Sequence, residues 1–152
     1  MPAVNFRLLL VTDRTQTGGR SFPSLIRQTV NAGLPAIQLR ERELPTRELL
    51  VLAREVRSIT APRAVPLLVN DRVDLVLAMD LDGVHLRANS LPVSVARRLV
   101  GPDRLVGVST HSINEVEQAN REGADYVLFG PIFDTPSKRP FGSPLGLSLI
   151  HI

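Results

Sequence analysis

The chain has 152 residues, of which 43% are hydrophobic, so it can bury one sizeable core and is expected to form one domain. It has no cysteine, which excludes disulfides, thiolate metal sites and cysteine nucleophiles and favours a reducing, cytoplasmic environment. No apolar run is long enough for a membrane span, and a net charge of +3 from scattered basic residues, with 4% aromatics, argues against a nucleic-acid surface.

Short apolar runs alternate with amphipathic stretches along the chain. The centres of the apolar runs lie 17 to 30 residues apart, which is the spacing of βα units, and no hairpin turn joins them. Near-continuous apolar strands are typical of a parallel sheet that helices cover. The expected strands are Leu8–Val11, Ala36–Leu39, Pro66–Val69, Gly83–Leu86, Leu105–Val108 and Tyr126–Phe129.

Helix start and stop signals lie between these strands. No linker or change of composition divides the chain, so residues 1–152 are expected to form a single domain. Four helices are expected. The first lies between Ser21 and Gly33, the second begins at a Thr46 cap, and the third runs from Pro92 to near Gly101. The fourth begins at a capping box of Ser112 and Glu115 and ends at Gly123.

Six βα units fit either an open doubly wound sheet or an eight-stranded barrel. An open sheet usually carries a glycine-rich first turn for a nucleotide, whereas the first strand here leads into Val11-Thr12-Asp13-Arg14. Polar residues instead follow strand after strand, as in a barrel that collects its active site at one rim. We therefore expect a TIM (β/α)₈ barrel, represented in this chain by about six βα units.

Polar clusters lie at the ends of five successive strands. Singly, each could be structural: the arginines could form surface salt bridges, and Asp71 could cap a helix. Together, their cations can bind phosphate oxygens, the arginines through forked guanidinium donors and the lysine as a compact charge. Asp71 adds a hard oxygen ligand of the kind that magnesium takes. The sequence therefore predicts a site for small phosphorylated molecules. The clusters are Gln38-Leu39-Arg40-Glu41-Arg42, Asn70-Asp71, His85, Ser109-Thr110-His111 and Gly130 to Lys138.

These clusters, in this order, resemble the thiamine-phosphate synthase family and the related thiazole tautomerases, from about Leu8 to Leu147. The resemblance implies a (β/α)₈ barrel that joins an aminopyrimidine methyl diphosphate to a hydroxyethylthiazole phosphate and releases pyrophosphate with Mg²⁺. Its most specific stretches are Gln38 to Arg42, Leu68-Val69-Asn70-Asp71, Asp82-Gly83-Val84-His85-Leu86, Gly107-Val108-Ser109-Thr110-His111, Gly130-Pro131-Ile132-Phe133 and Thr135-Pro136-Ser137-Lys138.

The resemblance also implies a role for each matching residue. Asp71 would bind Mg²⁺, and the candidate catalytic residues are Ser109, His111 and Lys138. Catalysis would stabilise a departing pyrophosphate while a pyrimidine carbocation forms. The substrate-binding set would be Gln38, Arg40 and Arg42 on the diphosphate, Asn70, Ser109 and Lys138 completing the pyrimidine diphosphate site, and Thr135 and Ser137 on the thiazole phosphate.

Departures from the family pattern keep two alternatives open. Synthases usually have lysine in place of Arg42 and a second magnesium carboxylate in place of Ser90, and a hydroxyl does not replace that charge. A thiazole tautomerase would need no magnesium pair and would use His111 as its acid–base group. A barrel that only binds thiazole phosphate is the non-enzyme alternative. The synthase is favoured.

The third departure is at the carboxyl end. After Gly146-Leu147 the family continues through two more strands and a phosphate loop, which this chain lacks. We therefore expect a fragment that is poorly stable and essentially inactive alone. The sequence predicts no oligomeric state.

Overall fold

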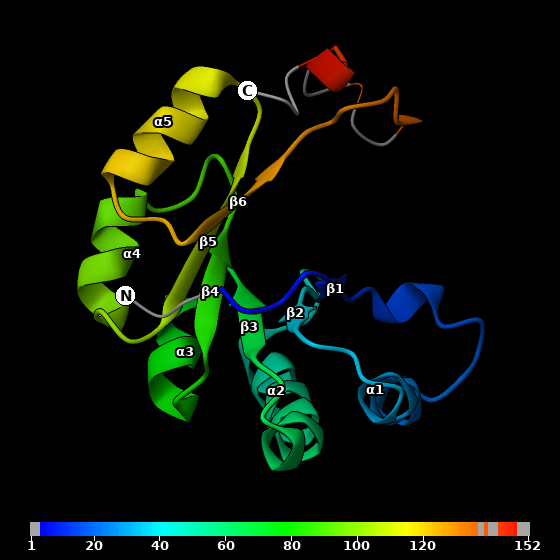
Figure 1. Ribbon diagram of the computed structural model, residues 1–152. Coiled ribbons are helices and arrows are strands. Elements are labelled where there is room, and N and C mark those ends of the chain that lie inside the picture. The colour runs from blue at the N-terminus through cyan, green and yellow to red at the C-terminus, as the bar shows by residue number, and fades with distance from the viewer. Residues whose placement is uncertain (1–3, 137–138, 140–142, 149–152) are drawn as a thin grey trace.

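A computed structural model describes residues 4–136, 139 and 143–148 of the chain (Figure 1). Six parallel strands form one sheet in the order β1 to β6, each hydrogen-bonded to the next strand along the chain. The strands are β1 Leu10–Val11, β2 Ile37–Leu39, β3 Leu67–Asn70, β4 Gly83–Leu86, β5 Leu105–Thr110 and β6 Tyr126–Phe129. The helices are α1 Phe22–Asn31, α2 Thr46–Thr60, α3 Val73–Met79, α4 Val93–Val100 and α5 Ile113–Arg121, with 3₁₀ turns η1 Arg14–Gln16 and η2 Ala61–Arg63.

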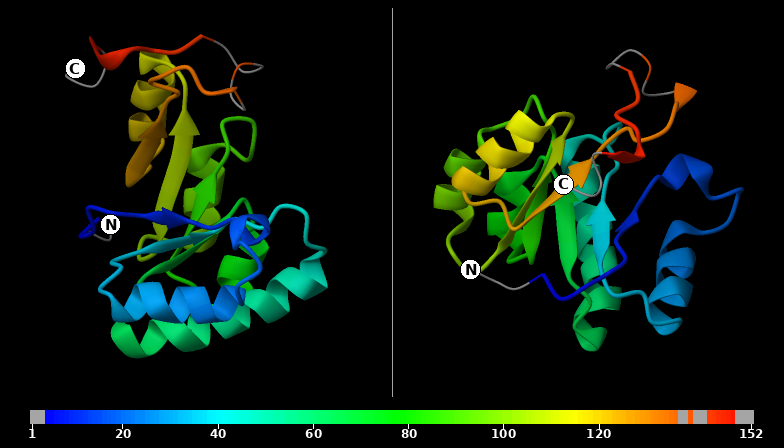
Figure 2. Two further views of the ribbon diagram at one scale, coloured as in Figure 1. Left: turned by 90° about the vertical axis from the view of Figure 1, so that its right-hand side faces the viewer. Right: turned by 45° about the horizontal axis from the view of Figure 1, so that its top comes forward.

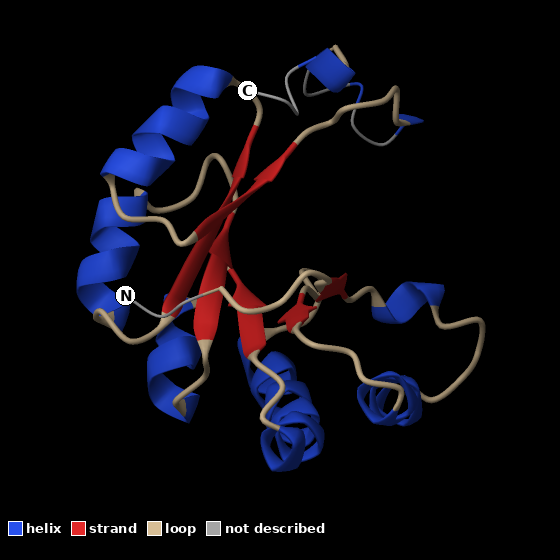
Figure 3. Cartoon of the chain, viewed as in Figure 1, coloured by secondary structure: helices blue, strands red, loops and turns tan. Residues whose placement is uncertain are grey.

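The unbroken strand order decides between the two architectures. A doubly wound sheet reverses its strand order at one point, whereas here every strand pairs with its sequence neighbours. Figures 1 and 3 show the strands curling into half a barrel, with the helices along its outer side. The expected barrel-type α/β fold is confirmed, as a half-barrel with β1 and β6 at its two ends (Figure 2).

The hydrophobic core lies between the outer face of the sheet and the helices. Side chains alternate along each strand, and one alternate set is apolar and packs against the helices. In β2, for example, Ile37 and Leu39 face the helices while Gln38 lies on the opposite face. No described helix is long and apolar enough to cross a membrane. The fully buried core includes Ile37, Leu39, Leu67, Val69, Val84 and Leu86 of the strands and Ala53 and Val56 of α2.

Several element boundaries differ from the sequence expectation by one or two residues: β2 begins at Ile37, β3 spans Leu67–Asn70 and β5 extends to Thr110. β1 begins at Leu10 rather than Leu8, whose side chain is 60% exposed. Thr46 is the first residue of α2, so Pro45 occupies the capping position. The Thr46 hydroxyl instead accepts a hydrogen bond from Arg72. The Ser112 cap is confirmed, because its hydroxyl accepts from the Glu115 amide.

An aspartate clamp, centred on Asp125, joins helix α4 to strands β5 and β6. Asp125, directly before β6, accepts a hydrogen bond from the Val106 amide of β5 at 2.7 Å and pairs with Arg97 of α4. Asp125 is 3% and Arg97 15% exposed, so this ion pair is largely shielded from water. The same arrangement recurs before β4, where Asp82 accepts from the Leu67 amide and pairs with Arg57 of α2.

Candidate functional site

Parallel strands end at the same edge of a sheet, so the polar side chains on the face opposite the helices come together there. Gln38 of β2 and Asn70 of β3 begin this row, and the Gln38 Nε2 donates to Asn70 Oδ1 at 3.1 Å. Gln38 is 2% exposed, and its Oε1 has no partner among the described residues. An unpaired buried carbonyl oxygen is costly, so a ligand that donates a hydrogen bond there would be favoured.

A buried histidine continues the row. His85 Nδ1 lies 3.1 Å from the Tyr126 hydroxyl, and Nε2 lies 3.0 Å from Ser109 Oγ. Burial lowers the pKa of His85 to about 4, with Asp71 opposing and Arg40 reinforcing the effect. Burial also raises the pKa of the Tyr126 phenol. At neutral pH both groups are uncharged, and His85 holds the Ser109 hydroxyl in place.

The pKa of His85 predicts how stability depends on pH. An unfolded histidine takes up a proton near pH 6.5, whereas folded His85 does so only near pH 4. The unfolding free energy should therefore be flat above about pH 6.5 and fall by up to about 3 kcal/mol towards pH 4. Urea unfolding across this range measures the slope. His85→Gln should lack the part of the slope due to this group, and an unchanged slope would show that His85 is not its source.

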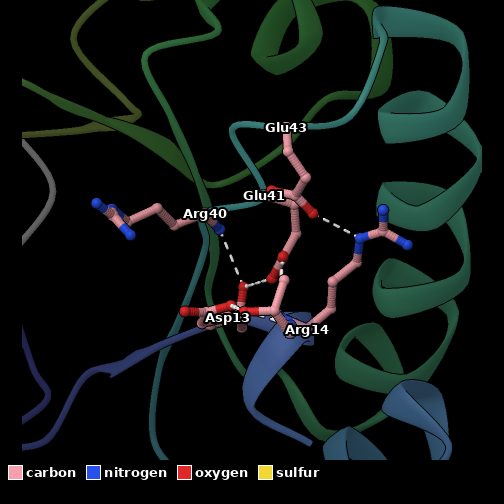
Figure 4. Close-up of polar contacts among 7 residues, drawn as sticks. Asp13, Arg14, Arg40, Glu41 and Glu43 are labelled. Atoms are coloured by element: carbon pink, nitrogen blue, oxygen red, sulfur yellow. Dashed lines mark hydrogen bonds and ion pairs between the residues drawn. The ribbon is translucent and has the colours of Figure 1, made fainter.

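A network of hydrogen bonds fixes the loop after β2 (Figure 4). The Glu41 carboxylate is 3% exposed and accepts from the Thr12 hydroxyl at 2.5 Å and the Arg14 amide at 2.9 Å. The Thr12 oxygen in turn accepts from the Arg40 amide at 3.0 Å. Figure 4 shows the Arg40 guanidinium pointing away from Glu41 and Glu43. The loop backbone is thus held while the Arg40 side chain stays available.

The surface salt-bridge alternative is not supported for this loop. Glu43 pairs with Arg14, at 2.6 Å, rather than with either arginine of the predicted phosphate site. Neither Arg40 nor Arg42 forms an ion pair within the described ranges. Their charges are therefore free for an anion.

A cavity of about 200 Å³ opens at the rim beside this loop. Asp71 lies in it with a left-handed backbone, φ 62°, and its carboxylate accepts from the Arg87 amide at 3.2 Å and pairs with Arg87 Nε. Partial burial raises the pKa of Asp71, but contacts with Ser90 and Arg87 outweigh it and hold that pKa below its usual range. α3 is preceded by Arg72, so Asp71 is not its cap. The cavity is lined by Leu39, Glu41, Arg42, Leu44, Leu49, Asn70, Asp71, Arg72 and Arg87.

His111 follows β5, at the entrance to α5. Its Nδ1 contacts the Gly130 carbonyl oxygen, and its amide donates to Glu115. A carbonyl oxygen only accepts, so Nδ1 must carry a hydrogen. Nε2 is then the nitrogen that remains for a ligand.

The last predicted cluster is only partly described. Thr135 is exposed, and its hydroxyl donates to the Phe133 carbonyl at 3.0 Å. Ser137 and Lys138 lie outside the described residues, so the predicted thiazole phosphate contacts and the lysine of the diphosphate site stay predictions.

The chain matches a known family in both sequence and structure. A family model described as "Thiamine monophosphate synthase" (TMP-TENI) matches residues 8–151. The chain belongs to this family. A "Putative thiamine-phosphate synthase" of Geobacter sulfurreducens is 46% identical over 147 residues, which are 97% of this chain and 69% of the relative. A "Thiamine-phosphate synthase" of Clostridium novyi is 39% identical over 145 residues, or 95% of this chain and 71% of the relative.

A solved structure shows the same fold. The thiamine phosphate pyrophosphorylase from Pyrococcus furiosus superposes with a TM-score of 0.79 at 32% identity, over 92% of this chain and 65% of that one. The chain thus spans about two thirds of the length of these members of the thiamine monophosphate synthase family.

Sequence reasoning missed several residues of the site. Tyr126 was recognised only as part of a strand, although it is the chain's single tyrosine. Arg87 and Arg72 follow strands in the same way as Arg40, yet neither belongs to the motifs that carry the family resemblance. Nothing in the local sequence marks Thr12 as a site residue, because its bond to Glu41 joins positions 29 residues apart.

The donor set does not fit a resident magnesium ion of the kind that the thiamine monophosphate synthase resemblance implies. Both Asp71 oxygens are engaged by Arg87, and Ser90 supplies a hydroxyl where a second carboxylate is expected. Across the part of the chain that the structure describes, no three His, Asp or Glu side chains gather as a metal site.

Proposed function

We propose that this chain acts in thiamine biosynthesis as a thiamine-phosphate synthase, a transferase that joins an aminopyrimidine methyl diphosphate to a hydroxyethylthiazole phosphate. The observation that carries the proposal is the rim where Arg40 and Arg42, which form no ion pair with any described residue, adjoin the buried row of Gln38, Asn70 and His85. The relatives' names support the same activity. A cytoplasmic location stays a prediction.

The buried row suits the aminopyrimidine better than the diphosphate. The sequence assigned Gln38 to the diphosphate, but one hydrogen of its Nε2 goes to Asn70, and its buried Oε1 is an acceptor without a partner among the described residues. Diphosphate oxygens are acceptors too, so they would not pair with Oε1. An amino group on a pyrimidine would donate to it, which leaves the diphosphate to Arg40 and Arg42 at the rim.

The chemistry needs charge stabilisation rather than proton transfer. The bond between the pyrimidine methylene carbon and the diphosphate oxygen breaks, and its electron pair leaves with pyrophosphate. Arg40 and Arg42 stabilise the negative charge that develops there. The thiazole nitrogen then donates its lone pair to the carbocation. His85, uncharged because burial lowers its pKa to about 4, puts no competing positive charge beside that cation.

Magnesium would find one carboxylate here, Asp71, together with the substrate's own phosphate oxygens. Because the Asp71 carboxylate is already paired with Arg87, we assign the stabilisation of the leaving pyrophosphate to the chain's own side chains.

Replacing Arg40 with glutamine should lower kcat/KM for thiamine phosphate formation about 10- to 100-fold, because a charge-assisted hydrogen bond to the leaving group is lost. The assay uses the chain itself and a hybrid continued with the remainder of the Geobacter sulfurreducens relative. We expect turnover from the hybrid, and diphosphate binding with little turnover from the chain alone. Arg47→Gln, which removes the same charge from an exposed position on α2, is the matched control. Equal rates for both variants would contradict the assignment.

A thiazole tautomerase is the second candidate, and one observation favours it. His111 donates from Nδ1 to Gly130, which leaves Nε2 as a base for moving a proton on a thiazole carboxylate phosphate. Isomerisation that needs no Mg²⁺ and is lost in His111→Ala would support this activity. Thiazole phosphate binding without turnover in either assay would instead indicate a binding protein.

A further inference from the structure

The contact between Asp71 and Arg87 is built into the sheet edge. The Asp71 amide donates to the His85 carbonyl at 2.9 Å, which continues the β3–β4 pairing and fixes the position of the aspartate. Arg87 directly follows β4 and uses both its amide and its Nε on the same carboxylate. The amide contact fixes the carboxylate against the Arg87 backbone, and the Nε contact holds the guanidinium beside it.

Arg87 keeps donors for a second partner. Only its Nε is used, and within residues 4–136 and the shorter described segments its terminal nitrogens make no hydrogen bond. The side chain is 50% exposed and lines the cavity with Arg42 and Arg72. Arg72 is engaged by Asp74 and Thr46, so Arg42 and Arg87 are the cations that can turn to a ligand.

The charge balance of the cavity also differs from that of a two-carboxylate metal site. Two carboxylates and a diphosphate repel one another unless a divalent cation lies between them. Here Ser90 is neutral, and the single charge of Asp71 is already matched by Arg87. A diphosphate can therefore approach without a bridging ion.

We propose that Arg87 replaces the divalent cation at Asp71 and binds the diphosphate directly, so that this chain binds diphosphates without a metal. The inference rests on the proposed synthase function, because that function supplies the diphosphate ligand. It assigns to Arg87 a role that no motif of the sequence indicated.

The test is calorimetric titration of the 152-residue chain with inorganic pyrophosphate, in EDTA and in Mg²⁺. We expect dissociation constants that agree within about threefold in the two buffers, because Arg87 supplies the cation in both. Arg87→Gln should weaken binding in EDTA about 10- to 100-fold, and Arg87→Lys, which keeps the charge but loses the fork, should lie between. Arg98→Gln, at an exposed position on α4, controls for net charge. Circular dichroism confirms that each variant is folded.

The outcomes separate this inference from the function on which it rests. Binding only in Mg²⁺, or binding in EDTA that Arg87→Gln and Arg98→Gln leave equally strong, overturns the role of Arg87 and leaves the synthase proposal standing. No pyrophosphate binding in either buffer overturns both. Metal-free binding that only the Arg87 variants weaken supports the inference.

Discussion

Replacing Asp125 with alanine should lower the free energy of unfolding by about 3–5 kcal/mol, because it leaves the shielded guanidinium of Arg97 without its counter-ion. The Val106 amide at the start of β5 loses its acceptor in the same step. The variant should melt at a markedly lower temperature, and chemical denaturation gives the free-energy difference.

The control is an ion pair exposed to water. Glu117 and Arg121 lie 3.7 Å apart on α5, with their side chains 60% and 69% exposed, so Glu117→Ala should cost less than about 0.5 kcal/mol. If Asp125→Ala were as mild as Glu117→Ala, Asp125 would not be clamping the strands.

Adding a single methyl group at Gly107 should be the second large effect. A Cβ at this position would overlap Cζ, Cε1 and the hydroxyl of Tyr126. Gly107 lies on buried β5 and half-buried Tyr126 is its partner on β6, so the ring must move and lose its contact with His85. Gly107→Ala should therefore destabilise the fold by about 1–3 kcal/mol, the usual cost of overpacking a core.

The chain itself supplies a probe for this change. It has one tyrosine and no tryptophan, so tyrosine fluorescence and absorption report on Tyr126 alone. Both spectra should shift in folded Gly107→Ala. Tyr126→Ala makes room for the methyl group, so the double variant should be less destabilised than the sum of the single ones. Strict additivity would contradict the overlap.

The strands and the rim were predictable from the sequence because both depend on local pattern. Apolar runs placed β4 and β6 at their observed bounds. The end strand β1 was overextended, since it pairs on one side only and Leu8 faces water. The parallel order places the carboxyl ends of the strands, with the described residues that follow them, at one edge of the sheet.

The partners of the site residues were not predictable. His85 bonds to Ser109 and Tyr126 across 24 and 41 residues, and no local pattern contains such a separation. For the same reason the sequence could not show that Asn70 takes the Gln38 donor. The sequence allows Asp71 to be a helix cap, whereas its carboxylate pairs with Arg87, 16 residues away.

The chain of contacts through His85 has a direction. A neutral imidazole has one N–H and one lone pair, so either Tyr126 donates to Nδ1 and Nε2–H donates to Ser109, or both bonds run the other way. Only the first arrangement leaves the Ser109 hydroxyl hydrogen free to point at an anion. A diphosphate bound to the Ser109 hydroxyl would thus favour one tautomer of His85 without contacting it. Tyr126, by donating to His85, would help to keep the Ser109 hydroxyl hydrogen free for the diphosphate.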